Sequence, residues 1–231
     1  MHKYACYCAT RNIYDKVIPS LKSLLKNSDV DTVYILAEDP AIGHPLPPSR
    51  VKVIDVSGQT FFPPTGPNFT CQWTYMVMMR VALCHILPDV DKILSLDYDT
   101  IVREDISDLW NWDLRDDYFA AAQEIHRDFH GQSYHNCGVV LWNLKQMRDG
   151  KADEVIRALN TRWYQFCEQD ALNALCAGRI QALPSMYNVC RFTKEPWPAP
   201  KIRHYAAEGD WYNREAEVRY WKELPWKEVL T

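Results

Sequence analysis

Two carboxylates separated by one residue, Asp97 and Asp99, directly follow the short apolar segment Lys92–Leu96. If that segment is a buried strand and the chain turns at its end, both side chains can converge on one divalent cation. Hard oxygen ligands of this kind favour Mg²⁺ or Mn²⁺. The spacing therefore predicts a metal site, with a solvated turn at a strand end as the plain structural alternative.

Two enzyme classes use such an aspartate pair. In one, a metal neutralises a departing diphosphate; in the other, haloacid-dehalogenase-type phosphatases, the first aspartate is the nucleophile and the second a general acid. The phosphatase motif follows the first strand of its domain and carries Thr or Val four residues after the first aspartate. Here the pair comes late in the chain and Ile101 fills that place, so the metal interpretation is favoured.

Strands alternate with helices upstream of the aspartates. Turn-forming residues cluster at 40–48 and 62–68, and Pro88 ends the last helix before the pair. This alternation predicts an α/β fold built on a mainly parallel sheet, in which ligands bind at the carboxyl ends of the strands. The expected strands are Lys3–Ala9, Thr32–Ala37, Val51–Val56 and Lys92–Leu96. Two helices are expected: one begins near Ile13, and the other spans Cys71–Leu87.

Further strands and helices are expected downstream of the pair. Asn143 is placed to cap a short helix that stops at Gly150. The other expected elements are the strands Tyr118–Gln123 and Cys137–Trp142, the helices Ala152–Trp163 and Glu168–Ala177, and an irregular segment at 197–200.

Composition narrows the function classes. The 231 residues carry 26 Lys and Arg against 30 Asp and Glu, and the formal charge of -4 argues against nucleic acid as a partner. Nothing at residues 1–9 resembles a secretion leader. The 8 cysteines form no repeated C-x-x-C pair, so we expect reduced, mostly buried thiols and a cytoplasmic protein.

Three segments together resemble the signatures of family 8 retaining glycosyltransferases, the family that contains glycogenin and bacterial lipopolysaccharide galactosyltransferases. Residues 87–102 (LPDVDKILSLDYDTIV) resemble its LPDxDKVLYLDxDxLV, residues 135–144 (HNCGVVLWNL) its FNAGVLLINL, and residues 168–173 (EQDALN) its DQDxLN. Residues 9–14 (ATRNIY) are similar to the nucleotide-binding opening of glycogenin-like members. The matches cover most of residues 9–205 in the expected order.

The resemblance implies a GT-A-type domain over residues 1–204, with a mainly parallel central sheet flanked by helices. It implies metal-dependent transfer of a hexose, galactose or glucose first, from a UDP-sugar to a carbohydrate or glycoconjugate acceptor, with retention of configuration. Asp97, Asp99 and His204 would hold Mn²⁺ or Mg²⁺. A sugar-nucleotide or glycan binding module that has lost transfer activity is the alternative.

The resemblance also assigns a donor site. Tyr14 would lie against the uracil, or else pack on the first helix as an ordinary core aromatic. Arg80 would face the diphosphate or the sugar near the metal, although a structural salt bridge competes. The backbone near Cys8 and Thr10 would grip the base, and Tyr98 belongs to the same site.

On the sugar side, the resemblance implies that Asn136 hydrogen-bonds a sugar hydroxyl and that Gly138 lets the backbone approach the donor. Glu168 and Gln169 would face the transferred sugar, with Gln169 nearest the anomeric carbon. Asp170 is the neighbouring acid, which at a helix start is also favourable with no function. No carboxylate nucleophile can be assigned, so front-side attack within an ion pair is expected.

The sequence departs from the family pattern at three places. The usual His-x-x-Gly-x-x-Lys reads His204 to Asp210, with Ala207 in place of Gly and Asp210 in place of Lys. Diphosphate binding should weaken unless Arg203 or Arg214 compensates. Glu168 and Glu124 replace the family's aspartates, which would narrow the sugar pocket.

The last segment, 205–231, is rich in aromatic residues. Its four basic residues face six acidic ones, so attraction to anionic lipid should be weak. We expect this tail to pack over the donor site as a lid, with peripheral membrane contact not favoured.

Overall fold

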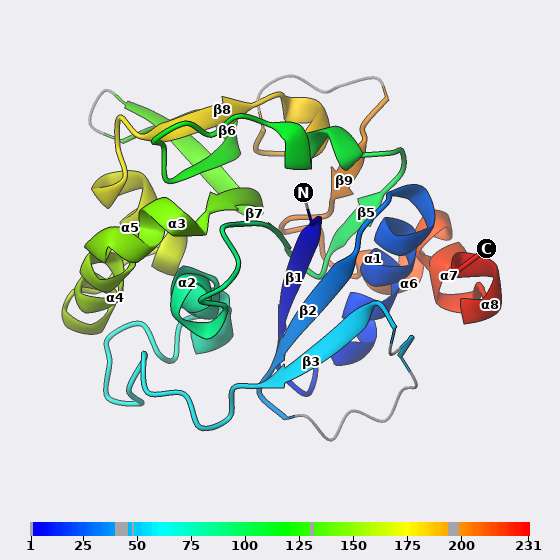
Figure 1. The fold of residues 1–231 in the computed structure, drawn as a ribbon, viewed down its shortest axis with the longest axis horizontal. Coiled ribbons are helices and arrows are strands. Elements are labelled where there is room, and N and C mark those ends of the chain that lie inside the picture. Colours follow the sequence, from blue (N-terminus) through cyan, green and yellow to red (C-terminus); the bar gives the residue numbers. More distant parts are fainter. Residues whose placement is uncertain (1, 40–45, 48, 130–131, 194–198) are drawn as a thin grey trace.

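A seven-stranded sheet forms the centre of the structure, a computed structural model that describes residues 2–39, 46–47, 49–129, 132–193 and 199–231. The strands lie in the order β3-β2-β1-β4-β7-β6-β8 (Figure 1). Their bounds are β1 (Tyr4–Ala9), β2 (Thr32–Ala37), β3 (Val51–Asp55), β4 (Lys92–Leu96), β6 (Phe119–Phe129), β7 (Gln132–Asn143) and β8 (Ile180–Leu183). A separate two-stranded sheet pairs β5 (Thr100–Val102) with β9 (Ile202–His204).

The central sheet is mostly parallel. The neighbouring pairs β2·β3, β1·β2, β1·β4 and β6·β8 run parallel, and only β7 is antiparallel to its neighbours β4 and β6. In the N-terminal half, the parallel pairing agrees with the alternation of strands and helices. Two parallel neighbours need a crossover connection, which a helix or a long loop between the strands supplies. The predicted mainly parallel α/β sheet is confirmed.

The predicted strands match best where apolar residues run continuously. β2 and β4 have the predicted bounds, and β1 starts one residue late. β6 and β7 are longer than predicted, because β6 continues to Phe129 and β7 already begins at Gln132. These extensions are mostly polar and hold only scattered apolar residues, so apolar patterning gave no clear signal for them.

Short helices make up much of the rest. The helix predicted over Cys71–Leu87 is wrong in its first four residues and in its winding. Thr74, with φ of 66°, breaks the backbone there and its side chain accepts from the N–H of Met76, so a tight 3₁₀ helix, η1, begins only at Tyr75. The helical elements are α1 (Tyr14–Asn27), η1 (Tyr75–Ala82), α2 (Leu83–Ile86), η2 (Ser107–Asn111), α3 (Leu144–Gln146), the π-helical turn η3 (Met147–Lys151), α4 (Ala152–Thr161), α5 (Cys167–Leu175), η4 (Ser185–Tyr187), α6 (Trp211–Arg214), α7 (Ala216–Glu223) and α8 (Trp226–Val229).

Local signals at helix ends are confirmed. The Asn143 side chain accepts from the N–H of Gln146, 3.3 Å away, as an N-cap does. Gly150 has φ of 94° where the short helix kinks, and Gly178 has φ of 79° after α5. The turn-rich segment predicted at 40–48 and the irregular segment at 197–200 lie partly outside the described residues.

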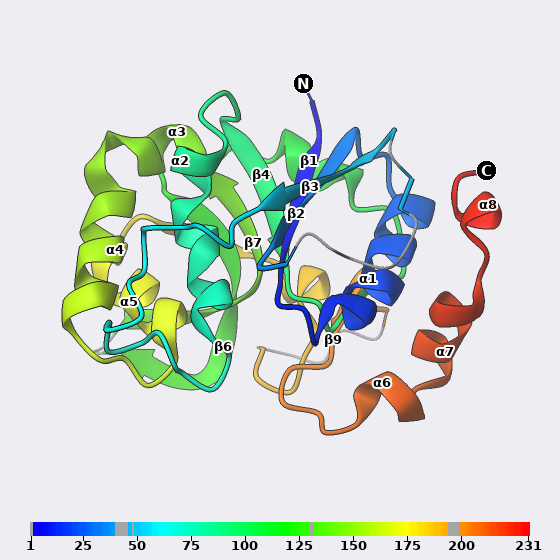
Figure 2. The same ribbon diagram turned by 90° about the horizontal axis from the view of Figure 1, so that it is seen from below.

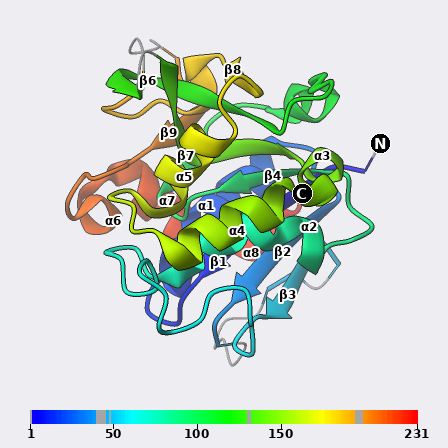
Figure 3. The ribbon, with the colours of Figure 1, turned by 90° about the vertical axis from the view of Figure 1, so that its left-hand side faces the viewer.

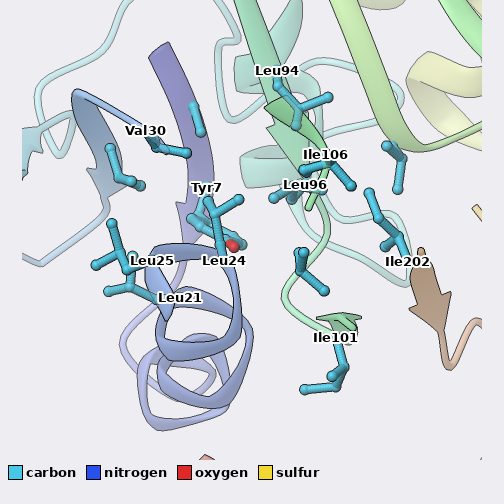
Figure 4. Close-up of a cluster of buried hydrophobic side chains, with 14 of the residues drawn as sticks. Tyr7, Leu21, Leu24, Leu25, Val30, Leu94, Leu96, Ile101, Ile106 and Ile202 are labelled. Atoms are coloured by element: carbon cyan, nitrogen blue, oxygen red, sulfur yellow. The ribbon is translucent and has the colours of Figure 1, made fainter. Parts of the chain in front are cut away.

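Helices cover the sheet on both sides. α2 to α5 lie on one side and α1 with α6 to α8 on the other, as Figures 2 and 3 show. Two hydrophobic clusters match these layers. The cluster on the α1 side joins Leu21, Leu24 and Leu25 to residues of β1, β4 and β9 (Figure 4), and the other packs the α2 to α5 layer on the opposite face.

The C-terminal helices dock mainly on α1. α7 and α8 both contact it, and the views agree that they lie beside it (Figure 2). Lys22 Nζ donates to the carbonyls of Lys222 and Leu224, at 3.0 and 2.6 Å. Only the first part of the tail, 205–209 and Trp211, faces the pocket described below.

Candidate active site

Asp97 and Asp99 stand in the turn between β4 and β5. The N–H of Asp97 donates to the carbonyl of Gly138 (2.7 Å), and the carbonyl of Asp99 accepts from the N–H of Tyr205 (2.9 Å). β5 then pairs with β9, which sets Thr100 opposite His204. The small second sheet thus brings an imidazole from far along the chain beside the aspartates.

These three side chains converge. His204 Nε2 lies 3.2 Å from Asp99 Oδ1 and 3.7 Å from Asp97 Oδ2, and one candidate ligand atom from each side chain lies within 4.8 Å of the others. Burial opposes protonation of the His204 ring, but the neighbouring Asp99 outweighs it and raises the pKa well above its ordinary value. Carboxylate oxygens with one imidazole nitrogen are a donor set that fits Mn²⁺ or Mg²⁺.

Gly138 makes room for the imidazole. A Cβ built at this position would stand 2.1 Å from Cε1 of His204. The glycine is therefore required by the packing of a metal-ligand candidate, which is more specific than a general approach of the backbone to the donor.

Arg80 lies between two carboxylates. It is 5% exposed, forms a hydrogen-bonded ion pair with Asp97, and its Nε lies 3.6 Å from Glu168 Oε1. Its guanidinium also donates to the carbonyl of Cys137 and, at 3.0 Å, to that of Val77. Burial raises the pKa of Glu168 to about 7 although Arg80 pulls it down. Arg80 thus forms the structural salt bridge of one interpretation and also lies beside the metal-ligand candidates, as the other interpretation requires.

A hydrogen-bond network continues from this centre. Asn136 Nδ2 donates to Glu124 Oε1 at 2.8 Å, and Gln169 Nε2 donates to the same oxygen at 3.2 Å. Gln169 also accepts from the N–H of Cys137 (2.8 Å) and donates to the hydroxyl of Tyr134 (3.1 Å). Both polar ends of Gln169 are held, so its side chain is fixed where it faces the pocket.

One cavity of about 660 Å³ joins these groups, a size in the range of ligand sites. Eleven of the predicted site residues line it: Cys8, Thr10, Arg80, Asp97, Tyr98, Asp99, Asn136, Gly138, Glu168, Gln169 and His204.

Two predicted site residues lie elsewhere. Tyr14 is 4% exposed in the α1-side core and does not line the cavity, because its position on α1 turns the ring inward. Asp170 also lies off the cavity. It accepts from the Tyr134 hydroxyl (2.6 Å) and from the N–H of Phe166 (2.9 Å), as an acid that stabilises a helix start does. Their positions favour the structural alternative for both residues.

The segment that departs from the family pattern lines the cavity, but its basic neighbours do not. Arg203 is ion-paired with Glu208 and donates to the carbonyls of Val189 and His204. Arg214 donates to the carbonyl of Gly209 at 2.7 Å. Neither arginine takes the place of the missing lysine in this conformation.

Sequence reasoning missed several residues. Asn188, fully buried, hydrogen-bonds both Asn136 and His204, and no motif pointed to it. Trp73 and Phe166 line the cavity with ring centroids 5.9 Å apart. The available signal was in the sequence around them. Trp73 lies just before the helix that carries Arg80, and Phe166 lies just before the motif that starts at Glu168.

The chain matches the model of glycosyl transferase family 8 over residues 6–207. It belongs to that family. The family is one of glycosyltransferases, so the match does not support the phosphatase alternative. Among the described residues, no helix has the length and apolar character to cross a bilayer.

Relatives agree with the assignment. The family-8 chain is 32% identical over 136 residues to glycosyltransferase GlyE of Streptococcus pneumoniae, covering 53% of this chain and 32% of that protein. It is 27% identical over 132 residues to the lipopolysaccharide 1,2-glucosyltransferase of Escherichia coli, covering 50% and 39%. The chain thus spans well under half of these relatives.

Solved structures show the GT-A fold. The crystal structure of GlyE matches with a TM-score of 0.76 at 20% identity, over 100% of this chain and 62% of that one. The galactosyltransferase LgtC, solved with donor and acceptor sugar analogues, matches with 0.67 at 19% identity, over 97% and 98%.

Proposed function

We propose that this family-8 chain transfers a hexose, galactose or glucose, from a UDP-sugar to a carbohydrate or glycoconjugate acceptor with retention of configuration, and that it needs Mn²⁺ or Mg²⁺. The observation that carries the proposal is the convergence of Asp97, Asp99 and His204 on one wall of a cavity large enough for a ligand. When held by these three side chains, a divalent cation would stabilise negative charge on a departing diphosphate.

The charge of the cavity supports a cation. Asp97, Asp99, Glu124, Glu168 and Glu208 line it, whereas Arg80 is the arginine on the same wall. Arg80 already forms ion pairs with Asp97 and Glu168. His204, with its raised pKa, adds one more positive charge in the metal-free site. A nucleoside diphosphate adds further negative charge, and a divalent cation would offset more of it than a single proton on His204 does.

The protein's own groups would orient the sugar. Asn136, Glu124 and Gln169 form one bonded set, and Glu124 and Glu168 are longer than the aspartates of the family pattern. Their carboxylates accept from sugar hydroxyls, and their fixed partners hold them in place before the substrate arrives. Gln169 faces the anomeric carbon in this proposal, and attack comes from the leaving-group side within an ion pair.

An aromatic corner supports a sugar acceptor. Trp73 lines the cavity while 41% exposed, so its ring lies where the cavity meets solvent. Phe166 packs against it. A flat, half-exposed indole offers apolar area at small entropy cost, which suits the C–H face of a pyranose.

A binding module without turnover is the second candidate. The observation that favours it is the replacement of the family Gly and Lys by Ala207 and Asp210, with Arg203 and Arg214 bonded elsewhere. Fewer positive groups at the diphosphate would weaken both donor binding and departure of the leaving group.

Release of UDP from UDP-galactose and UDP-glucose, with Mn²⁺ and with a chelator, tests the proposal. We expect metal-dependent release, slow without acceptor, and its loss in Asp99→Asn. Asp89→Asn, which makes the same change at an exposed aspartate before β4, should release UDP at the normal rate. Tight donor binding with no release from either sugar would favour the binding module, and undiminished release by Asp99→Asn in chelator would refute the metal role.

A further inference from the structure

Asn188 connects the sugar side of the cavity to the metal-ligand candidates. Its side chain is buried (0% exposed). One end lies 2.9 Å from Asn136 Oδ1, and the other lies 2.8 Å from Nδ1 of His204. A buried amide held at both ends has one permitted orientation, and its neighbours determine which.

The orientation of Asn136 is fixed first. The N–H of Gly138 lies 3.0 Å from one end of its amide, and a backbone N–H can only donate, so that end is the oxygen. The other end lies 2.8 Å from Glu124 Oε1, a carboxylate oxygen that accepts, so that end is the NH₂ group. Two independent partners agree.

The orientation of Asn188 and the proton on His204 follow. Because Asn136 presents its oxygen, Asn188 must present its NH₂ group there. Its carbonyl oxygen is then left facing Nδ1 of His204, and a carbonyl can only accept. Nδ1 must therefore carry a proton, which leaves Nε2 as the nitrogen that faces Asp97 and Asp99.

We propose that Asn188 is a positioning residue that holds a proton on Nδ1 of His204 and thereby reserves Nε2 for a divalent cation. The order of donors and acceptors begins at the Glu124 carboxylate and the Gly138 N–H, passes through Asn136 and Asn188, and ends at the imidazole. A residue with only a donor or only an acceptor could not continue it, because Asn136 needs a donor and His204 an acceptor. The role of the cation rests on the proposed function; the position of the proton does not.

Nuclear magnetic resonance of protein with ¹⁵N-labelled histidine tests the proton directly. We expect a one-bond ¹⁵N–¹H signal from Nδ1 of His204, slow to exchange with water, under two conditions. In metal-free protein Nε2 should carry a proton as well, because Asp99 raises the pKa of the ring. With diamagnetic Mg²⁺ and UDP only the Nδ1 proton should remain. His204→Gln assigns the signal. An unprotonated Nδ1 in the normal protein would overturn the proposal without any variant.

Mn²⁺ titration in the presence of UDP tests the consequence. Asn188→Leu removes the acceptor while keeping bulk, and its Kd for Mn²⁺ should rise about 10- to 100-fold, the usual effect of losing such a partner. Asn188→Asp keeps an acceptor toward Nδ1 but loses the donor to Asn136, so it should recover only part of the affinity. Asn68→Leu is the matched control, since Asn68 is an equally buried amide that bonds Leu159, Arg162 and Tyr164 away from the cavity.

The outcomes separate the two proposals. A folded Asn188→Leu with normal Mn²⁺ affinity, or Asn188→Asp no better than Asn188→Leu, overturns the role of Asn188. If Asn188→Leu does not fold, the Asn188→Asp titration and the Nδ1 signal decide. If the normal protein shows the Nδ1 proton but binds no Mn²⁺, the metal part of the proposed function fails and the reservation of Nε2 fails with it, while the hydrogen-bond order stands.

Discussion

Two buried cations on opposite faces of the sheet show how differently the molecule uses charge. Arg80 and Lys22 are each 5% exposed. Arg80, in η1, faces the carboxylates of Asp97 and Glu168 at the cavity. Lys22, on α1, bonds the carbonyls of Lys222 and Leu224 at the end of α7 and lies 5.3 Å from the ring of Trp226.

Their pKa values move in opposite directions. Burial works against the charge of both. At Arg80 the carboxylates of Asp97 and Glu168 outweigh burial and raise the pKa. At Lys22 burial lowers the pKa. Arg80, Asp97 and Glu168 therefore form a group of interacting charges at the cavity. Lys22 instead stabilises the packing of α1 against the end of α7.

Removing Arg80 should have the largest effect. Arg80→Met leaves the buried Glu168 and the partly exposed Asp97 without their cation, which costs about 3–5 kcal/mol of unfolding free energy. UDP release should fall at least about 100-fold, equal to ~2.7 kcal/mol in the barrier. Chemical denaturation and a UDP-release assay measure the two quantities.

Arg80→Lys is the matched control. It keeps the charge but loses the planar group that bonds Asp97 and Cys137 together. We expect intermediate stability and activity. Activity near normal in Arg80→Met would mean that Arg80 has no part in the chemistry and serves only the structure, as Lys22 does.

Glu168, the partner of Arg80, should make stability depend on pH. Its pKa of about 7 in the folded protein lies above its ordinary 4.5. A raised acid pKa means that the folded state binds the proton more tightly, so this contribution is complete below pH ~4.5 and is lost as pH rises through about 7. The loss is at most about 3.5 kcal/mol, for a shift of about 2.5 pKa units at ~1.4 kcal/mol per unit.

Glu168→Gln should abolish that dependence. In chelator, its unfolding free energy relative to the normal protein should increase between pH 5 and pH 8. Glu154→Gln, at a half-exposed partner of Lys151, is the control and should leave the profile unchanged. A difference that shrinks toward pH 8 would contradict the burial of a protonated Glu168.

Lys22→Met should lower stability and spare the chemistry. The carbonyls of Lys222 and Leu224 would lose a charged donor, which costs about 1–3 kcal/mol. Lys26→Met, whose exposed lysine bonds the carbonyl of Glu228, should cost less. UDP release below the unfolding transition should match the normal protein. A loss like that of Arg80→Met would mean that docking of α7 and α8 controls the cavity.

Trp73→Ala should affect the acceptor and not the donor. Removal of the half-exposed ring should raise the acceptor KM about 10-fold, near the ~1.4 kcal/mol of a good aromatic contact. UDP release without acceptor should stay normal. Trp163→Ala is the control, because Trp163 is 65% exposed and does not line the cavity. Equal effects on both reactions would place the ring at the donor instead.

The sequence predicted the parts of the site that lie at strand ends. Asp97 and Asp99 follow β4 as expected, and apolar runs gave β2 and β4 their bounds. The family motifs brought in Asn136, Gln169 and His204, all of which line the cavity. Short-range patterns and motif order were enough for these residues.

Contacts between distant segments escaped prediction. Asn188 matters because β9 places His204 beside it, and no local pattern records that pairing. The side of α1 on which Tyr14 lies depends on helix rotation, and its aromatic ring fitted a ligand or the core equally well. The predicted lid faces the cavity only through its first residues, because α7 and α8 find partners on α1.

Ala207 should give the smallest effect, at the segment between the cavity and the docked helices. It has φ of 57°, a left-handed backbone that disfavours a Cβ, where the family pattern has Gly. Ala207→Gly should raise the unfolding free energy by about 0.5–1 kcal/mol, since relief of strain exceeds the extra entropy of glycine. Asp210→Gly, also at φ of 57°, should gain less because Asp tolerates this region better. Urea denaturation measures both. If Ala207→Gly lowers the stability instead, the methyl group of Ala207 makes stabilising contacts that outweigh the backbone strain. The segment would then belong structurally to the cavity wall that it lines and not to the helices on α1.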